Sequence, residues 1–310
     1  MQLRLVVFFL MATAAWAQTN TVIPKPARPF RAVEHVLIIC IDGLRPDRAL
    51  LADMPTLRGM LREGAYTFWA RTTAVSITLP SVTSMLTGVI PQKHGIQWNE
   101  DLPINPPVYP KVPTVMEMAG RAGYTTGMVA GKSKFSVLNK PGTIRHVALP
   151  EGINTSEDDA TVAAETVKLI EAHQPGLLFV HFPEVDAAGH AKGWGSPEQL
   201  ETIAHLDTQL AKVLAALDRS GLRQSTAIIL TADHGGAGKT HGADDPRSRH
   251  IPWVITGPGV RPGYDLTQVP ELIVNTEDTC ATACYLLGLS QLPYFDGKPV
   301  LAAFVNPPAP

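Results

Sequence analysis

Four short segments of this sequence carry carboxylate, imidazole and hydroxyl groups of the kinds that bind metal ions and attack phosphorus. They read HVLIICIDG (35–43), ITLPSVTSMLTG (77–88), VDAAGH (185–190) and TADHGGAGKTHG (231–242). Their seven candidate residues are Asp42, Thr78, Asp186, His190, Asp233, His234 and His241. Zinc accepts imidazole and carboxylate ligands, and two such ions can clamp the attacking and leaving oxygens of an in-line displacement. Phosphoryl transfer at two adjacent metal ions is therefore the first chemistry that these residues predict.

The hydrophobic pattern predicts the elements that would position these residues. Nearly continuous apolar runs, typical of strands covered on both faces, occur at 35–41, 125–130, 176–182, 226–231 and 251–256. Helical patterns occur at 53–63, 112–120, 156–173, 197–220 and 277–288. Strands that alternate with helices predict an α/β fold, doubly wound, with a mostly parallel sheet and helices on both faces.

Two helix starts have sequence signals of their own. Ser156 with Asp159 indicates the start of one helix, and Ser196 before Pro197 indicates the start of another.

The predicted strands bring the acidic candidates to one edge of the sheet. Asp42 ends the run 35–41, Asp186 lies just past 176–182, and Asp233 lies just past 226–231. Ligands bind at the carboxyl ends of the strands in open α/β sheets. We therefore expect these three residues to converge, although they are far apart in the sequence.

Each motif also has a simpler interpretation when it is taken alone. Thr78 precedes a helical run, so its hydroxyl could be an ordinary helix cap. Asp186 with His190 could form a surface turn, and a histidine in a glycine-rich loop is often merely solvated. His250 is an alternative seventh ligand, but we prefer His241 because His250 directly enters the apolar run IPWVIT. The remaining histidines, among them His181, are interpreted as surface or packing residues.

Together, the four segments resemble the metal motifs of the alkaline phosphatase superfamily, and most closely its type I phosphodiesterase/nucleotide pyrophosphatase branch. The resemblance runs from about His35 to Val300. It implies two zinc ions, whose ligand sets are Asp42, Asp233 and His234 for one and Asp186, His190 and His241 for the other. It also implies that Thr78 is the nucleophile, through a phosphothreonine intermediate. Asn99, in HGIQWN (94–99), resembles the family asparagine whose amide holds a phosphate oxygen.

The sequence departs from the family pattern in ways that bear on specificity. His234 and His241 are only seven positions apart, so we expect no large cap domain between them. After the run 125–130 stands GKSKF, whose Lys132 and Lys134 resemble the lysine pairs of monoester-selective phosphatases and phosphonoacetate hydrolases. Our hypothesis is that Lys132 and Lys134 favour phosphomonoesters; the alternative is a pair of solvated surface lysines.

The amino-terminal sequence predicts export. An arginine, the apolar run LVVFFLMATAAW and an A-x-A site predict a signal peptide at 1–17, cleaved after Ala17, and hence a periplasmic or secreted protein without a membrane anchor. A proline-rich stretch then predicts an extended lead-in at 18–34. No later segment is long enough for a convincing second domain, so a single catalytic domain is expected at 35–310. The formal net charge of −2 does not indicate binding to a nucleic-acid polymer, and a small phosphate ester is the expected partner. Oligomeric state stays open.

Other functions are compatible with parts of this pattern. A phosphonate hydrolase of the same superfamily, or a catalytically silent metal-binding relative, are the alternatives to a phosphodiesterase or phosphatase. A sulfatase would need a Cys or Ser in a C/S-x-P-x-R setting, which ITLPS lacks. A related mutase would normally have a serine nucleophile and a second inserted domain, and neither is evident in this sequence.

Overall fold

The computed structural model describes residues 25–309. The predicted signal peptide and the first part of the predicted lead-in lie outside these residues. From residue 25 to residue 34 the chain forms neither helix nor strand.

An eight-stranded sheet, in the order β4-β3-β5-β1-β6-β7-β2-β8, forms the centre of the molecule. Its strands are β1 (His35–Ile41), β2 (Ala65–Arg71), β3 (Thr126–Ala130), β4 (His146–Ala148), β5 (Leu177–Phe182), β6 (Thr226–Ala232), β7 (His250–Thr256) and β8 (Tyr264–Asp265). The central strand β1 pairs in parallel with β5 and β6, whereas β7 runs antiparallel to both of its neighbours. The predicted α/β fold with a mostly parallel sheet is confirmed, and no separate cap domain stands out between residues 25 and 309.

Three strands were not predicted from the apolar runs. In β2, AYTFWAR, buried and partly exposed residues roughly alternate, as in a strand with one covered face. The strands β4 and β8 have three and two residues, too few to give a periodic signal.

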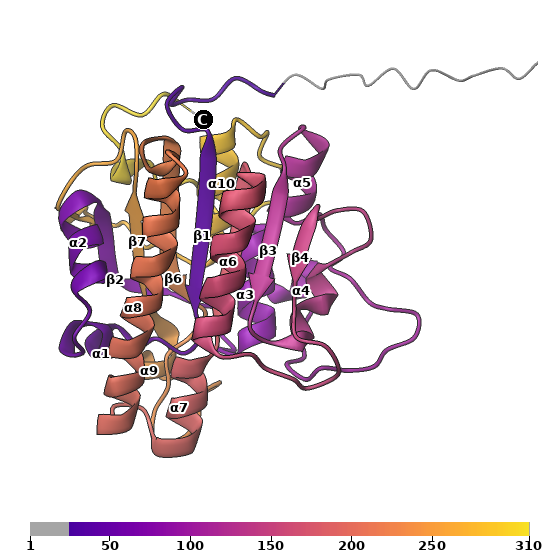
Figure 1. Ribbon diagram of the computed structural model, residues 1–310, viewed down its shortest axis with the longest axis vertical. Helices are drawn as coiled ribbons and strands as arrows, with labels where there is room; N and C mark the ends of the chain where they lie inside the picture. Colours follow the sequence, from indigo (N-terminus) through magenta and orange to yellow (C-terminus); the bar gives the residue numbers. More distant parts are fainter. Residues whose placement is uncertain (1–24, 310) are drawn as a thin grey trace, which may run out of the picture.

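Helices cover both faces of the sheet, with α6 and α8 in front of it and α3 and α10 behind it in the view of Figure 1. The helices are α1 (Pro46–Leu51), α2 (Pro55–Glu63), α3 (Thr78–Thr87), α4 (Pro91–His94), α5 (Val115–Arg121), α6 (Asp159–His173), α7 (Glu184–Lys192), α8 (Pro197–Arg219), α9 (Pro246–Arg249) and α10 (Glu277–Leu287). Every residue of α3 and of α10 is buried. Helix α3 is apolar or small on all sides, whereas α10 also buries Glu277 and Asp278 in its first turn. Among the described residues, no helix has the length and apolar character needed to cross a membrane.

The two predicted helix starts have different outcomes. Helix α8 begins as expected, because the Ser196 hydroxyl accepts a hydrogen bond from the amide of Gln199 at 3.2 Å. Helix α6 is capped by Asp158, whose carboxylate accepts from the amide of Thr161 at 2.6 Å. The expected start at Ser156 is wrong, because that hydroxyl donates to the carbonyl of Gly131 at 2.8 Å.

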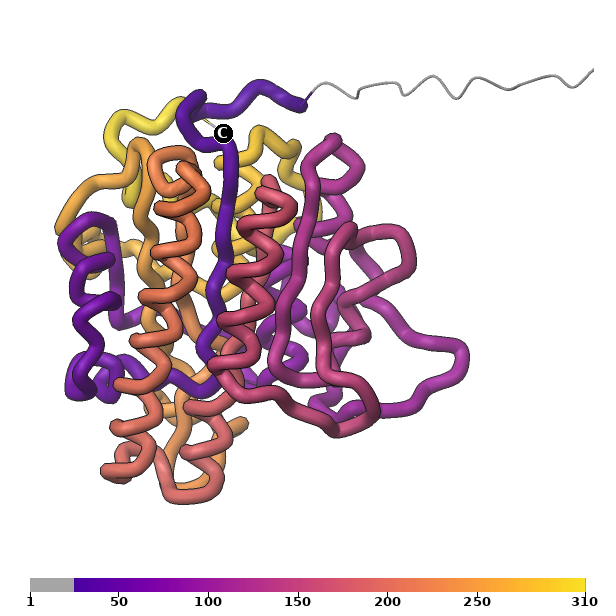
Figure 2. The backbone as a smooth tube through the Cα atoms, in the orientation of Figure 1, coloured from indigo at the N-terminus to yellow at the C-terminus, as the bar shows by residue number. Residues whose placement is uncertain are grey.

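The carboxyl ends of three neighbouring strands meet at one edge of the sheet. Ile41 at the end of β1 is in register with Phe182 of β5 and with Ala232 of β6. The tube in Figure 2 shows the indigo β1 in the middle of the molecule, beside segments that come much later in the chain. Asp42 and Asp233, which directly follow β1 and β6, therefore start from adjacent positions.

Candidate metal centre

The first group of candidate ligands is completely buried and lies at the ends of β1 and β6. Asp42, Asp233 and His234 have no exposed surface. The His234 ring atom Nε2 lies 3.3 Å from Asp42 Oδ1 and 3.5 Å from Asp233 Oδ2. The amides of Gly43 and His234 both donate to Asp233 Oδ1, at 3.0 and 2.9 Å, and so fix that carboxylate.

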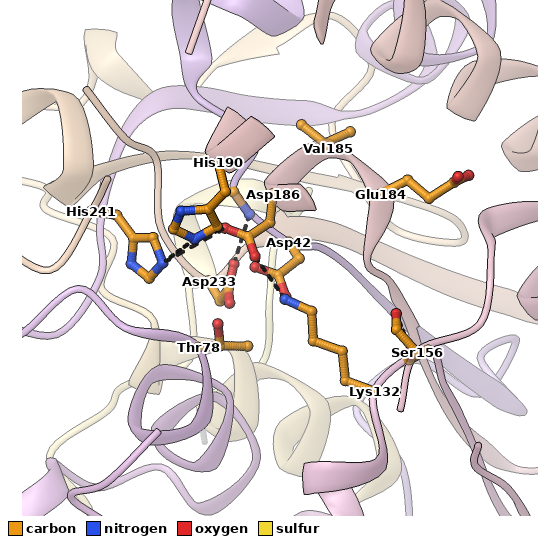
Figure 3. Close-up of polar contacts among 12 residues, drawn as sticks. Asp42, Thr78, Lys132, Ser156, Glu184, Val185, Asp186, His190, Asp233 and His241 are labelled. Atoms are coloured by element: carbon orange, nitrogen blue, oxygen red, sulfur yellow. Dashed lines mark hydrogen bonds and ion pairs between the residues drawn. The ribbon is translucent and has the colours of Figure 1, made fainter. Parts of the chain in front are cut away.

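The second group comes from α7 and the glycine-rich loop, as Figure 3 shows. Asp186 and His190 lie four residues apart on α7, so the alternative of a surface turn is wrong. The His190 Nε2 atom lies 3.3 Å from Asp186 Oδ1, and His241 Nε2 lies 3.1 Å from His190 Nε2. Asp186, His190 and His241 therefore lie close together, as expected, but the helix that carries Asp186 and His190 was not predicted.

The three histidines share an orientation that suits metal binding. Their Nδ1 atoms donate to backbone carbonyls: His190 to Lys239 at 3.0 Å, His234 to Gly235 at 2.8 Å and His241 to Ser76 at 2.9 Å. A proton held on Nδ1 leaves the Nε2 lone pair free, which is the usual arrangement of metal-binding histidines. All three Nε2 atoms face the carboxylates.

Several carboxylate oxygens in this cluster have no hydrogen-bond partner. They are Asp42 Oδ1, Asp186 Oδ1 and Asp233 Oδ2, and each is hidden from solvent. Burying an unpaired anionic oxygen is strongly unfavourable. Ligand atoms of Asp186, His190 and His241 converge, as do those of Asp42, Asp186 and His234. The residues therefore fit divalent cations.

Burial and neighbouring charges shift the pKa values in this cluster, upward for some residues and downward for others. Burial, with the nearby charge of Asp42, raises the pKa of Asp233 to about 7. Burial would also raise the pKa of Asp42, but Lys132 and the imidazoles of His181 and His234 hold it well below its usual value. Burial lowers the pKa of His241 to about 4, so this imidazole is neutral at pH 7, as a metal ligand must be.

One buried residue of the cluster was missed. His181, in β5, has no exposed surface, and its Nε2 lies 3.0 Å from Asp42 Oδ2. Its ligand atoms also converge with those of Asp42 and Asp233. The sequence alone predicts only a surface or packing role for His181. Its position opposite Cys40 in the parallel pair β1–β5, next to the end of β1, is the signal that could have found it.

The two lysines of the GKSKF segment have different surroundings. Lys132 Nζ lies 2.7 Å from Asp42 Oδ2 and 2.7 Å from Asp186 Oδ2, so it bridges the two ligand groups. Lys134 Nζ donates to Asn99 Oδ1 at 3.0 Å. Neither is a freely solvated surface lysine, because the side chain of Lys132 is 17% exposed and burial lowers the pKa of Lys134.

Thr78 and Asn99 lie at the amino-terminal end of α3. The residue before the helix is Ile77, so the alternative that Thr78 is an ordinary helix cap is wrong. The Thr78 hydroxyl lies 3.2 Å from His234 Nε2, and Thr78 as a residue is 1% exposed. Asn99 Oδ1 also accepts from the amide of Leu79 at 2.9 Å, which turns the side-chain NH₂ group of Asn99 away from these donors.

His250, the alternative to His241 as a metal ligand, does not belong to the cluster of converging ligand atoms. It begins β7 and stacks on Trp69 with ring centroids 4.0 Å apart. His241 instead stacks on His234 with ring centroids 3.7 Å apart.

A reciprocal pair of hydrogen bonds positions α7. The amide of Asp159 donates to Glu184 Oε2 at 3.0 Å, and the amide of Glu184 donates to Asp159 Oδ1 at 3.2 Å. Each residue is the first of its helix, so each carboxylate caps the other helix. Burial and the charge of Glu184 raise the pKa of Asp159 to about 8.

This pair gives a pH-dependent prediction. Because the folded-state pKa of Asp159 lies above its unfolded value of about 3.9, its stabilising contribution is full below that value. It is lost as the pH rises through about 8. We expect Asp159→Asn to lessen the fall in unfolding free energy between pH 5 and pH 8.5, measured by urea denaturation. Asp218→Asn, at an exposed position on α8, should leave that fall unchanged. An identical fall in wild type and Asp159→Asn would contradict the prediction.

Comparison with known proteins identifies the family of this chain. The family model described as type I phosphodiesterase / nucleotide pyrophosphatase matches residues 36–244. The chain belongs to this family.

Human ectonucleotide pyrophosphatase/phosphodiesterase family member 5 is 22% identical over 245 residues, which cover 74% of this chain and 49% of the human protein. An uncharacterized pyrophosphatase/phosphodiesterase of Schizosaccharomyces pombe is 24% identical over 216 residues, covering 65% of this chain and 44% of the yeast protein. The chain thus spans less than half the length of these relatives.

Solved structures show the same fold. Murine ectonucleotide pyrophosphatase/phosphodiesterase 5, as an inactive threonine-to-alanine variant in complex with AMP, has a TM-score of 0.71 at 17% identity. The match covers 88% of this chain and 100% of the murine one. A putative sulfatase from Bacteroides thetaiotaomicron has a TM-score of 0.69 at 16% identity, covering 86% of this chain and 73% of the sulfatase. These structures confirm the predicted fold, and the family-model match over residues 36–244 confirms the type I phosphodiesterase/nucleotide pyrophosphatase branch of the alkaline phosphatase superfamily.

Proposed function

We propose that this protein is a metal-dependent phosphoester hydrolase in which Thr78 attacks phosphorus and is transiently phosphorylated. The position of the Thr78 hydroxyl carries the proposal, because it lies 3.2 Å from His234 Nε2 in the buried cluster. A threonine hydroxyl is a weak nucleophile unless a neighbouring group activates it. Thr78 also opens α3, whose positive dipole end favours the negative charge of a phosphoryl group.

Two divalent ions fit the cluster, and zinc is the expected metal. Following the family resemblance, we assign Asp42, Asp233 and His234 to one ion. The other ion takes Asp186, His190 and His241, whose ligand atoms converge. When bound, such ions supply Lewis acidity and lower the pKa of a bound hydroxyl or water. The chain's own contribution is orientation, since backbone carbonyls hold the three imidazoles with Nε2 toward the cluster.

Asn99 and Lys134 would hold the non-bridging oxygens of the phosphate. Asn99 Oδ1 accepts from both Leu79 and Lys134, which leaves the Asn99 NH₂ group free to donate. Lys134 adds a positive charge beside it. Donors already aimed at the place where charge develops stabilise a transition state without having to reorganise.

A neighbouring pocket of about 380 Å³ would take the leaving group. Leu79 and Lys134 line it, together with the aromatic side chains of Trp98 and Tyr109. Phe135 and Trp194 are not among the residues that line it: Phe135 is fully buried, and the indole of Trp194 donates to the carbonyl of Gly43 at 2.9 Å. Together with the AMP complex of the murine relative, these walls support a small ester with a nucleoside or other aromatic leaving group.

Because Lys132 and Lys134 have different surroundings, the hypothesis about monoesters can be assigned to one of them. Lys132 is held by two carboxylates, so Lys134 is the lysine that would meet the extra charge of a monoester. We expect Lys134→Ala to lower kcat/KM for p-nitrophenyl phosphate by about ten- to a hundredfold, and for bis-p-nitrophenyl phosphate by less than about threefold. Steady-state assays of the metal-loaded variants measure both.

Lys140→Ala, at an exposed lysine whose side chain is 50% accessible, is the matched control and should change neither rate. Equal losses on the two esters in Lys134→Ala would refute the monoester hypothesis but leave the hydrolase proposal standing. The hydrolase proposal itself fails if metal-loaded wild type turns over neither ester.

A further inference from the structure

A second pocket, of about 420 Å³, lies beside the loop that leads into α3. Its walls come from residues 72–75, from the start of α4 and from the start of α10. They include Thr73, Val75, Ile90, Gln92, Asn275 and Glu277. None of the candidate metal ligands, nor Thr78, Asn99 or either lysine, lines it.

Glu277 is the unusual group in this pocket. It is 7% exposed, and within residues 25–309 no basic side chain lies within 4.0 Å of its carboxylate. The neighbouring acids are satisfied: Asp278 accepts from the amides of Asn275 and Lys298, both at 2.7 Å. Asp296 pairs with Lys93 at 2.6 Å.

Arg249 also lines this pocket and acts on the charge of Glu277, but its guanidinium is already engaged by other groups. Arg249 Nη1 pairs with Asp244 at 2.7 Å, and its Nη2 donates to the carbonyl of Thr72 at 3.2 Å. Glu277 is therefore a buried carboxylate on a pocket wall that no side chain in the described structure neutralises. Such a group is strongly unfavourable when ionised, unless a proton or a ligand compensates it.

Glu277 changes its charge near neutral pH. Burial, together with the charges of Asp278 and Asp296, raises its pKa to about 7, against the opposing effects of its own backbone amide and of Arg249. At pH 8 the group is mostly ionised and available to pair with a cation, whereas at pH 6 it is mostly protonated.

We propose that this pocket binds a small organic cation whose protonated amine pairs with Glu277 and whose apolar part lies against Val75, Ile90 and Pro80. A bare metal ion fits less well, because Glu277 belongs to none of the groups of converging ligand atoms among the described residues. The volume suits a ring with a short aminoalkyl arm. The proposal does not depend on the phosphoesterase activity.

The test compares benzylamine with its neutral counterpart benzyl alcohol on the metal-loaded protein, by titration calorimetry. We expect benzylamine to bind and benzyl alcohol to bind at least about tenfold more weakly, since an ionic hydrogen bond is lost. We also expect benzylamine affinity to rise about tenfold from pH 6 to pH 8, because Glu277 ionises over that range.

Two variants locate the binding. Glu277→Gln should lose at least about tenfold in benzylamine affinity, while Glu165→Gln, at a half-buried glutamate of α6 away from this pocket, should not. Ala74→Trp places a bulky ring at an exposed position on the pocket wall and should also abolish binding, so it decides the matter if Glu277→Gln does not fold. Equal affinities for the amine and the alcohol, or unchanged benzylamine binding in Glu277→Gln or Ala74→Trp, would overturn the proposal.

Discussion

Replacing Thr78 with alanine is expected to lower phosphoester turnover by at least about a thousandfold, because the attacking oxygen is removed. The substitution deletes one hydroxyl and leaves all the carboxylates and imidazoles of the cluster. Metal content, measured by mass spectrometry of the metal ions, should therefore stay close to that of the wild type. A small residual rate is compatible with the account, since orientation by Asn99 and Lys134 persists.

The matched control is Thr78→Ser, which keeps a hydroxyl at the same place on α3. We expect it to retain turnover within about two orders of magnitude of the wild type, because the nucleophilic group persists and only its positioning loosens. Acid-quenched wild type incubated with p-nitrophenyl phosphate should carry one added phosphoryl group on Thr78 in peptide mass spectra, because p-nitrophenolate leaves as the bond to Thr78 forms. Turnover near the wild-type rate in Thr78→Ala would rule out the nucleophile assignment.

Replacing Lys132 with methionine is expected to cause the largest loss of stability in the metal-free protein. Lys132 Nζ lies 2.7 Å from both Asp42 and Asp186, and both carboxylates are buried. Their charges raise the pKa of Lys132 although burial alone would lower it. Removing one partner of a buried ion pair leaves uncompensated charge and typically costs about 3–5 kcal/mol. Urea denaturation in the presence of a chelator measures this loss.

Lys168→Met provides the control, because Lys168 pairs with Glu165 at 2.6 Å on the solvent side of α6 with 70% of its side chain exposed. An exposed pair of this kind contributes about 0–1 kcal/mol. Zinc should recover much of the stability lost in Lys132→Met, because cations that bind only the folded state add to its stability. If Lys132→Met loses no more unfolding free energy than Lys168→Met, the interpretation of Lys132 as the group that neutralises the carboxylates of the metal-free protein is wrong.

The sequence predicted the parts of this molecule that repeat a strong local pattern. The buried strands β1, β5 and β6 are continuous apolar runs, and acidic residues at or just beyond their ends converge, as the parallel topology requires. The family resemblance was carried by short motifs at those ends, and the match over residues 36–244 confirms it.

Other features depend on contacts across the sheet, which no local pattern contains. His181 lies in an apolar strand, and its contact with Asp42 depends on the register between β5 and β1. The bridging position of Lys132 depends on α7 packing beside the end of β3, and α7 itself is too polar and too short to give a clear helical periodicity. The cap by Asp158 was displaced from the expected Ser156 by two residues, which is within the ordinary uncertainty of helix ends.

The most direct measurement is the hydrolysis of p-nitrophenyl phosphate and bis-p-nitrophenyl phosphate at alkaline pH by zinc-loaded protein, with and without a chelator. We expect turnover of at least one ester, its loss on chelation and its return when zinc is restored, with Thr78→Ala at least about a thousandfold slower throughout. Turnover that survives complete removal of metal, or metal-loaded protein that hydrolyses neither ester, would contradict the central claim.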